Sequence, residues 1–129
     1  MEEPLFLTLD HILRLHARQL EQFGGAEGVR DLQLIESAIA QPQQGFGGEY
    51  VHKDIAEMAA AYLFHLAKNH GFIDGNKRVA AGSALVFLEI NGVDTAVINE
   101  DEMEALTLSI ADGTGDKQKA AAFFRQFIS

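Results

Sequence analysis

The sequence predicts an all-α fold in a single domain that spans residues 1–129. Apolar residues recur with helical spacing along most of the chain. Good N-cap residues precede these periodic segments, and glycine or proline follows them. A length of 129 residues suits one domain, and an apolar content of 47% can fill one core.

The first two helices are expected to begin at Thr8 and Asp31, because both residue types cap helix N-termini well. Residues 9–23 show helical spacing and are followed by two glycines, which tolerate the left-handed conformation that ends a helix. The second helix should stop before Pro42. Residues 43–51 are polar, glycine-rich and aromatic, which indicates a mobile loop or a short hairpin.

The two following helices should form the centre of the molecule. The third begins at Asp54, is rich in alanine and is apolar on most faces, so we expect it to be buried. The fourth runs from about Asn76 to Glu89 and ends at the Asn91-Gly92 pair.

The C-terminal third is also expected to be helical. Residues 93–98 suggest a short extended segment. Asn99 then caps a helix over residues 100–110, whose acidic start suits the positive end of the helix dipole. Asp116 should open a last helix that ends near Phe127.

Composition excludes several classes of protein. The absence of cysteine rules out a disulfide framework, a thiol nucleophile and a cysteine-based metal site, and suits a reducing cytoplasm. Residues 1–4 lack the features of a signal peptide, and no apolar run can span a bilayer, so we expect a cytoplasmic protein. A net charge of -9 disfavours binding to nucleic acid or to anionic membranes.

A stretch dense in ionisable groups, residues 70–78, separates the two central apolar runs. Chemistry explains this density better than packing does, because both flanking runs, residues 55–67 and 79–90, read as buried helices. The candidate functional side chains are His70, Asp74, Asn76, Lys77 and Arg78.

These residue types suit the binding of a phosphate. The first N–H groups of a helix lack internal partners and attract anions, and Gly75 would let an anion approach the backbone. Lys77 and Arg78 oppose the helix dipole unless an anion is bound there. Asp74 beside a phosphate is a suitable ligand for Mg²⁺, and His70 is a candidate general base.

Each residue also has a purely structural interpretation. Taken alone, His70 also suits the C-terminal cap of the third helix, and Asp74 also suits a turn. Lys68 either interacts with the C-terminal end of the helix dipole or binds phosphate. The two cations after Asn76 could be merely solvated, but their isolation in an acidic chain favours an anion site.

Residues 70–78 resemble the signature of the Fic superfamily, in the form of its death-on-curing (Doc) toxin branch. The general pattern is H-P-F-x-[DE]-G-N-G-R-x-x-R, and the Doc branch has lysine in place of the second glycine. This chain reads His70-Gly71-Phe72-Ile73-Asp74-Gly75-Asn76-Lys77-Arg78. The resemblance extends to Leu15-His16, Gln19-Leu20, Phe23-Gly24-Gly25, Arg30-Asp31, Glu36-Ser37-Ala38, Gln41-Pro42 and Asn91-Gly92.

Two positions depart from the general pattern. Gly71 replaces the proline, a change expected to loosen the backbone next to His70. The four residues after Arg78, up to Gly82, include no arginine. Fic enzymes that transfer AMP have a second arginine in this stretch, where it is a phosphate ligand.

The resemblance implies a Fic/Doc-like helical bundle with a catalytic loop between two central helices. It also implies the toxin of a type II toxin–antitoxin system, a kinase that uses ATP and Mg²⁺ to phosphorylate a hydroxyl of elongation factor Tu and thereby arrests translation. His70 would be the base, Lys77 would also be catalytic, and Asp74 would hold the metal. The nucleotide and phosphate ligands would be Lys68, Gly75, Asn76, Lys77 and Arg78.

The resemblance also implies partners. A Phd-like antitoxin would act in trans, through a C-terminal segment that folds on binding. A flap that aligns the target beside the active site would consist of Phe46, Gly47, Gly48, Glu49 and Tyr50. Two alternatives remain open: AMP transfer to a protein, or a catalytically inactive phosphate-binding or antitoxin-docking protein.

Overall fold

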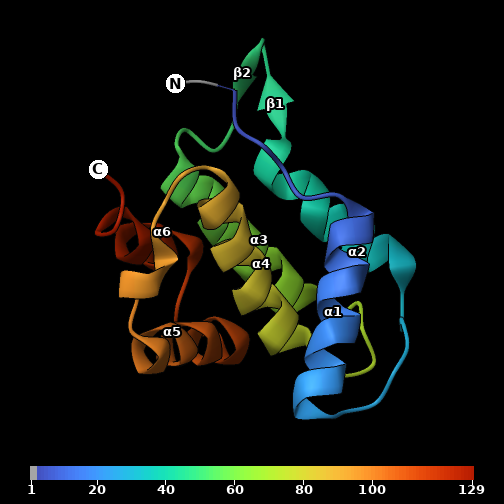
Figure 1. The fold of residues 1–129 in the computed structure, drawn as a ribbon. Coiled ribbons are helices and arrows are strands. Elements are labelled where there is room, and N and C mark those ends of the chain that lie inside the picture. The colour runs from blue at the N-terminus through green and yellow to red at the C-terminus, as the bar shows by residue number, and fades with distance from the viewer. Residues whose placement is uncertain (1–2) are drawn as a thin grey trace.

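The computed structural model describes residues 3–129, and this part of the chain is mostly helical (Figure 1). Its α-helices are α1 (Leu9–Phe23), α2 (Leu32–Ala40), α3 (Ile55–Asn69), α4 (Asn76–Ile90), α5 (Glu100–Asp112) and α6 (Lys117–Arg125). The other elements are the 3-10 turns η1 (Gln41–Gln43) and η2 (Thr95–Val97) and the strands β1 (Gly45–Phe46) and β2 (Glu49–Tyr50). The all-α prediction is confirmed, and the described residues add only this short antiparallel hairpin.

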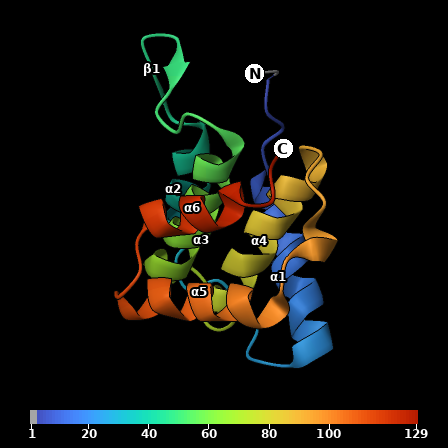
Figure 2. The same cartoon turned by 90° about the vertical axis from the view of Figure 1, so that its left-hand side faces the viewer.

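Helix α3 lies at the centre of the bundle. It packs most extensively against α4 and α6, and small alanine side chains along its length let these neighbours approach closely. Helices α1 and α2 cover one side of the α3–α4 pair, and α5 and α6 cover the other (Figures 1 and 2). The largest fully buried side chains include Tyr62, Phe72, Phe87 and Phe124.

Five of the helices begin at the predicted N-caps, and each cap side chain accepts a backbone N–H of the first turn. These caps are Thr8, Asp31, Asp54, Asn99 and Asp116. Helix α4 differs, because its N-cap is Gly75 and no side chain caps it. Its first N–H groups, which lack helical partners as in any helix, therefore have no side-chain cap as acceptor either.

Two expected boundaries need correction. Residues 93–98, expected to be extended, contain the turn η2, because the Asp94 carboxylate accepts a bond of 3.0 Å from the N–H of Ala96. Helix α6 ends at Arg125, before Phe127. Among the described residues, no helix has both the length and the apolar character needed to cross a bilayer.

The two ends of α3 carry different connections. The β1–β2 hairpin precedes its N-terminal end, and the loop of residues 70–75 follows its C-terminal end. A helix of 15 residues separates them by about 22 Å, and both views place them at opposite ends of the bundle (Figures 1 and 2).

Candidate active site

The loop of residues 70–75 starts with an unusual backbone conformation. His70 is the C-cap of α3 and adopts left-handed angles of φ 51° and ψ 48°. Among the described non-glycine residues it alone has a positive φ. This conformation costs roughly 1–2 kcal/mol for a residue with a side chain, so the surrounding structure has to hold it. The side chain of His70 is exposed and is accessible to a substrate.

A second stretch of chain, which we call the crossing segment (residues 24–31), lies along this loop. The backbone N–H groups of Arg30 and Asp31 both donate to the carbonyl of Gly71, at 2.8 and 3.0 Å. An isolated antiparallel bridge beside these bonds joins the two stretches. The crossing segment therefore restrains the loop through backbone contacts.

Gly71 is required here by close approach. A Cβ atom at this position would overlap the side chain of Ile35 on α2. Because the Gly71 carbonyl accepts two backbone bonds, the glycine does not leave this backbone loose, and that expectation was wrong. Helix α2 occupies the space that a proline ring would need.

The carboxylate of Asp74 is exposed and ionised. Its oxygens accept bonds from the N–H groups of Ala26, at 3.1 Å, and Gly75, at 2.8 Å. These two donors, in that order, together with the nearby charge of Arg78, hold the pKa of Asp74 below its usual range. A carboxylate has about four lone-pair sites, so it keeps acceptor capacity for another ligand.

This single carboxylate fits Mg²⁺. The described residues contain no cluster of three or more metal-ligating side chains, as a closed site for zinc would require. Mg²⁺ instead keeps several waters and binds through one or two carboxylates together with substrate phosphates. Asp74, at the edge of the α4 N-terminus, matches that donor set.

Asn76 holds the loop closed. Its side-chain oxygen accepts from the N–H of Phe72 at 3.0 Å, and its amide nitrogen donates to the Phe72 carbonyl at 2.9 Å. Its side chain is therefore engaged with the loop, and its backbone N–H remains for an anion at the start of α4. Gly75 precedes it with φ 80°, a conformation that favours glycine.

The cations lie in different surroundings. Lys77 and Arg78 are both exposed, and the guanidinium carbon of Arg78 lies 4.4 Å from the ring centroid of Phe23. The amine of Lys68 lies near the C-terminal end of α5, where hydrogen bonds and, to a smaller extent, its charge lower the pKa of Asp112. The structure thus brings Lys77 and Arg78 to the start of α4, and a phosphate role for Lys68 stays a prediction.

One face of α1 supports the loop, a role that the sequence did not reveal. Nε2 of His16 lies 2.7 Å from the carbonyl oxygen of Asp74, which can only accept, so this nitrogen carries a proton. The ring also stacks on Phe72, at 3.8 Å between centroids. Gln19 donates to the carbonyl of Arg78 at 3.0 Å. The sequence feature that could have indicated this role is the pair His16 and Gln19, two polar residues three positions apart on the inward face of a predicted helix.

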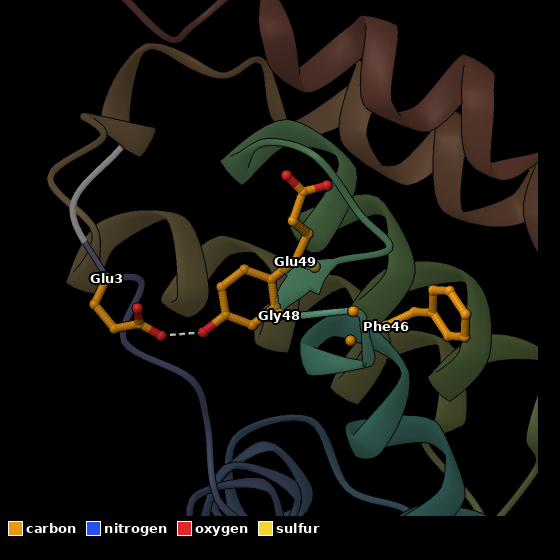
Figure 3. Close-up of a pocket in the computed structure, with 7 residues that line it drawn as sticks. Glu3, Phe46, Gly48 and Glu49 are labelled. Carbon is orange, nitrogen blue, oxygen red and sulfur yellow. Dashed lines mark hydrogen bonds between the residues drawn. The ribbon is translucent and has the colours of Figure 1, made fainter.

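The residues expected to form a flap lie elsewhere. Phe46 to Tyr50 form the β1–β2 hairpin at the other end of α3, beside a hollow of about 350 Å³ that Glu3 also lines (Figure 3). The hydroxyl of Tyr50 donates to Glu3, and Phe46 is 87% exposed. The structure therefore places the hairpin away from residues 70–78, and a target-binding role for Phe46 to Tyr50 stays a prediction. The crossing segment lies beside residues 70–78 instead, because tertiary packing joins it to Gly71.

Two comparisons with known proteins find relatives of this chain. A family model described as the Fic/DOC family matches residues 6–88. A protein named Toxin Doc from Mycolicibacterium smegmatis is 41% identical over 108 residues, which cover 83% of this chain and 83% of the relative. Protein kinase doc from Escherichia phage P1 is 36% identical over 107 residues, which cover 83% of this chain and 82% of that protein.

Proposed function

This chain belongs to the Fic/Doc family, and we propose that it is a Doc-type toxin that transfers a phosphoryl group from ATP to a protein hydroxyl. One observation carries this proposal. An exposed histidine, an ionised carboxylate and an uncapped helix N-terminus with two exposed cations all lie on residues 70–78. The names of the two relatives, a toxin and a protein kinase, support the same chemistry.

The proposed roles follow from position. His70 accepts the proton of the attacking hydroxyl, whose oxygen forms a bond to the γ-phosphorus while the bond to the ADP oxygen breaks. Lys77, Arg78 and the N–H groups at the start of α4 bind the phosphate oxygens, with Gly75 allowing their close approach. Catalysis in such transfers comes mainly from positioning and from charge stabilisation.

Asp74 would hold Mg²⁺, because its carboxylate is ionised, exposed and adjacent to the phosphate site. When bound, the ion neutralises charge on the phosphate oxygens. Asn76 contributes by closing the loop around Phe72 and by its backbone N–H.

The protein target and the antitoxin are further parts of this proposal. By family resemblance the target is elongation factor Tu, whose phosphorylation arrests translation. A Phd-like antitoxin neutralises the toxin in trans. The crossing segment borders His70, and its exposed Val29, with Ile73 on the loop, offers the target an apolar surface there.

The proposal is tested by incubating the protein with a target extract and ATP labelled at either the α- or the γ-phosphate. We expect only the γ-label to reach protein, and neither label with His70→Ala or Asp74→Ala. Transfer of the α-label alone would establish AMP transfer instead. ATP binding without transfer of either label would identify an inactive phosphate-binding protein.

A further inference from the structure

We propose that Arg30, on the crossing segment, is a positioning residue that holds His70 in its reactive orientation. The inference rests on the proposed function, in which His70 is the base. Arg30 itself does not touch the reacting atoms; it acts through the backbone that carries the histidine.

The side chain of Arg30 binds the C-terminal end of α3. Its Nε donates to the carbonyl of His70 at 2.7 Å, and its Nη2 donates to the carbonyl of Asn69 at 3.3 Å. The last carbonyls of a helix have no partners within the helix. A planar guanidinium can bind two neighbouring carbonyls at once, because its donors form a rigid fork.

The backbone of Arg30 binds the next carbonyl along the chain. Its N–H donates to the carbonyl of Gly71 at 2.8 Å. One residue therefore binds the carbonyls of Asn69, His70 and Gly71, which are three consecutive peptide groups. The first two of these groups flank the Cα of His70, so their orientation sets where its side chain leaves the backbone.

His70 needs such support, because its left-handed conformation is unfavourable for a residue with a side chain. The carbonyl of a left-handed C-cap points away from the helical path, and here it meets the Arg30 guanidinium. Without that donor we expect the end of α3 to relax, so that the imidazole moves relative to the phosphate site. Among the described residues, the hydrogen bonds of Arg30 go to Asn69, His70 and Gly71 and none goes to the start of α4, so we expect that end to keep its anion donors.

The test compares Arg30→Ala and Arg30→Lys with the wild type and with Arg14→Ala. Arg14 on α1 serves as the control, because its side chain is exposed and forms an ion pair with Asp10 at 3.0 Å. A misplacement of about 1 Å can cost about 100-fold in rate, and we expect a kcat loss of that order for Arg30→Ala. The affinity for ATP·Mg²⁺ should change less than about threefold, since the phosphate site is intact. Arg14→Ala should match the wild type.

Two further readouts separate positioning from general loss of structure. Arg30→Lys should keep part of the activity, because an ammonium cannot bind both carbonyls as a fork does. Added guanidinium ions at low concentration should raise the kcat of Arg30→Ala and leave Arg14→Ala unchanged. Equal losses of kcat and of ATP affinity, without rescue, would overturn the inference.

The NMR signals of His70 test the inference without an activity assay. In Arg30→Ala its backbone and ring signals should move away from the wild-type positions, while the signals of α5 stay unchanged. Unchanged His70 signals overturn the inference. If the wild type transfers no phosphate and the His70 signals still move, the positioning role stands and the proposed phosphoryl transfer fails.

Discussion

The two connections that flank α3 differ in how the rest of the molecule holds them. The loop of residues 70–75 is hydrogen-bonded to α1 and to the crossing segment, and Ile35 of α2 packs beside its Gly71. The β1–β2 hairpin at the other end projects from the bundle, and its tip carries the exposed Phe46 (Figures 1 and 3). Both stretches are rich in glycine and both contain charged and aromatic residues.

The two connections differ in the polar contacts that hold them in place. In the loop, the Arg30 guanidinium binds the carbonyl of the left-handed His70, and two backbone N–H groups bind the ionised carboxylate of Asp74. In the hairpin, the exposed carboxylate of Glu49 lies 4.0 Å from the amine of Lys53, and the bond of Tyr50 to Glu3 is surface-exposed. The number of restraints on a loop therefore separates the candidate active site from a projecting turn of similar composition.

The largest expected effect comes from comparing a substitution in the loop with one in the hairpin. His70→Ala should lower kcat by about 100-fold or more, the usual contribution of a general base. Phe46→Ser should leave kcat unchanged, since its ring lies away from the loop. Transfer rates of labelled phosphate measure both. A large loss of kcat with Phe46→Ser would show that the hairpin contributes to catalysis.

The packing of the loop is tested by Gly71→Ala. The added methyl would overlap Ile35, and overpacking of this kind costs about 1–3 kcal/mol of unfolding free energy. Denaturant unfolding measures this loss. In the double variant with Ile35→Ala the two losses should be less than additive, by about 0.5–3 kcal/mol. Simple additivity would mean that Gly71 and Ile35 are not in contact.

A smaller effect is expected where α1 meets the phosphate site. Phe23→Leu removes the ring beneath Arg78 while keeping an apolar side chain. Exposed cation–π contacts contribute about 0.5–1 kcal/mol, so the dissociation constant for ATP should rise about two- to fivefold. Titration with a fluorescent nucleotide measures it. Tighter binding would show that Phe23 instead competes with phosphate for the guanidinium.

The smallest effect should come from a cluster of two histidines and a lysine where α6 meets α3. Nζ of Lys117 lies 3.0 Å from Nε2 of His65 and 3.5 Å from Nε2 of His52. Burial, with the charge of Lys117, lowers the pKa of His65 from 6.5 to about 4. The unfolded chain therefore binds a proton below about pH 6.5 that the folded chain does not bind, so stability falls as the pH drops toward 4.

Thermal unfolding between pH 7 and pH 4.5 checks this prediction. The melting temperature of the wild type should fall more steeply with acidification than that of His65→Gln, whose side chain does not titrate, by a few degrees. Above pH 6.5 the difference between the two proteins should stay constant. Parallel curves over the whole range would show that His65 titrates normally in the fold.

Local patterns predicted the helices well. Thr8, Asp31 and Asp116 were recognised as caps because capping depends on residues within one turn of each other. The motif of residues 70–78 was found for the same reason, since its members are close in the sequence. The 3-10 turn after Asp94 was missed, because one short side-chain bond outweighed the extended pattern.

The sequence by itself determined the helical fold, the candidate base at His70, the carboxylate at Asp74 and the cations at the start of α4. Only the tertiary structure decided which glycine-rich stretch lies beside them. Arg30 reaches His70 across 40 positions of the chain, and His16 reaches Asp74 across 58. Periodicity and capping act over a few residues, whereas contacts over such separations depend on how α1 and α2 pack against α3 and α4.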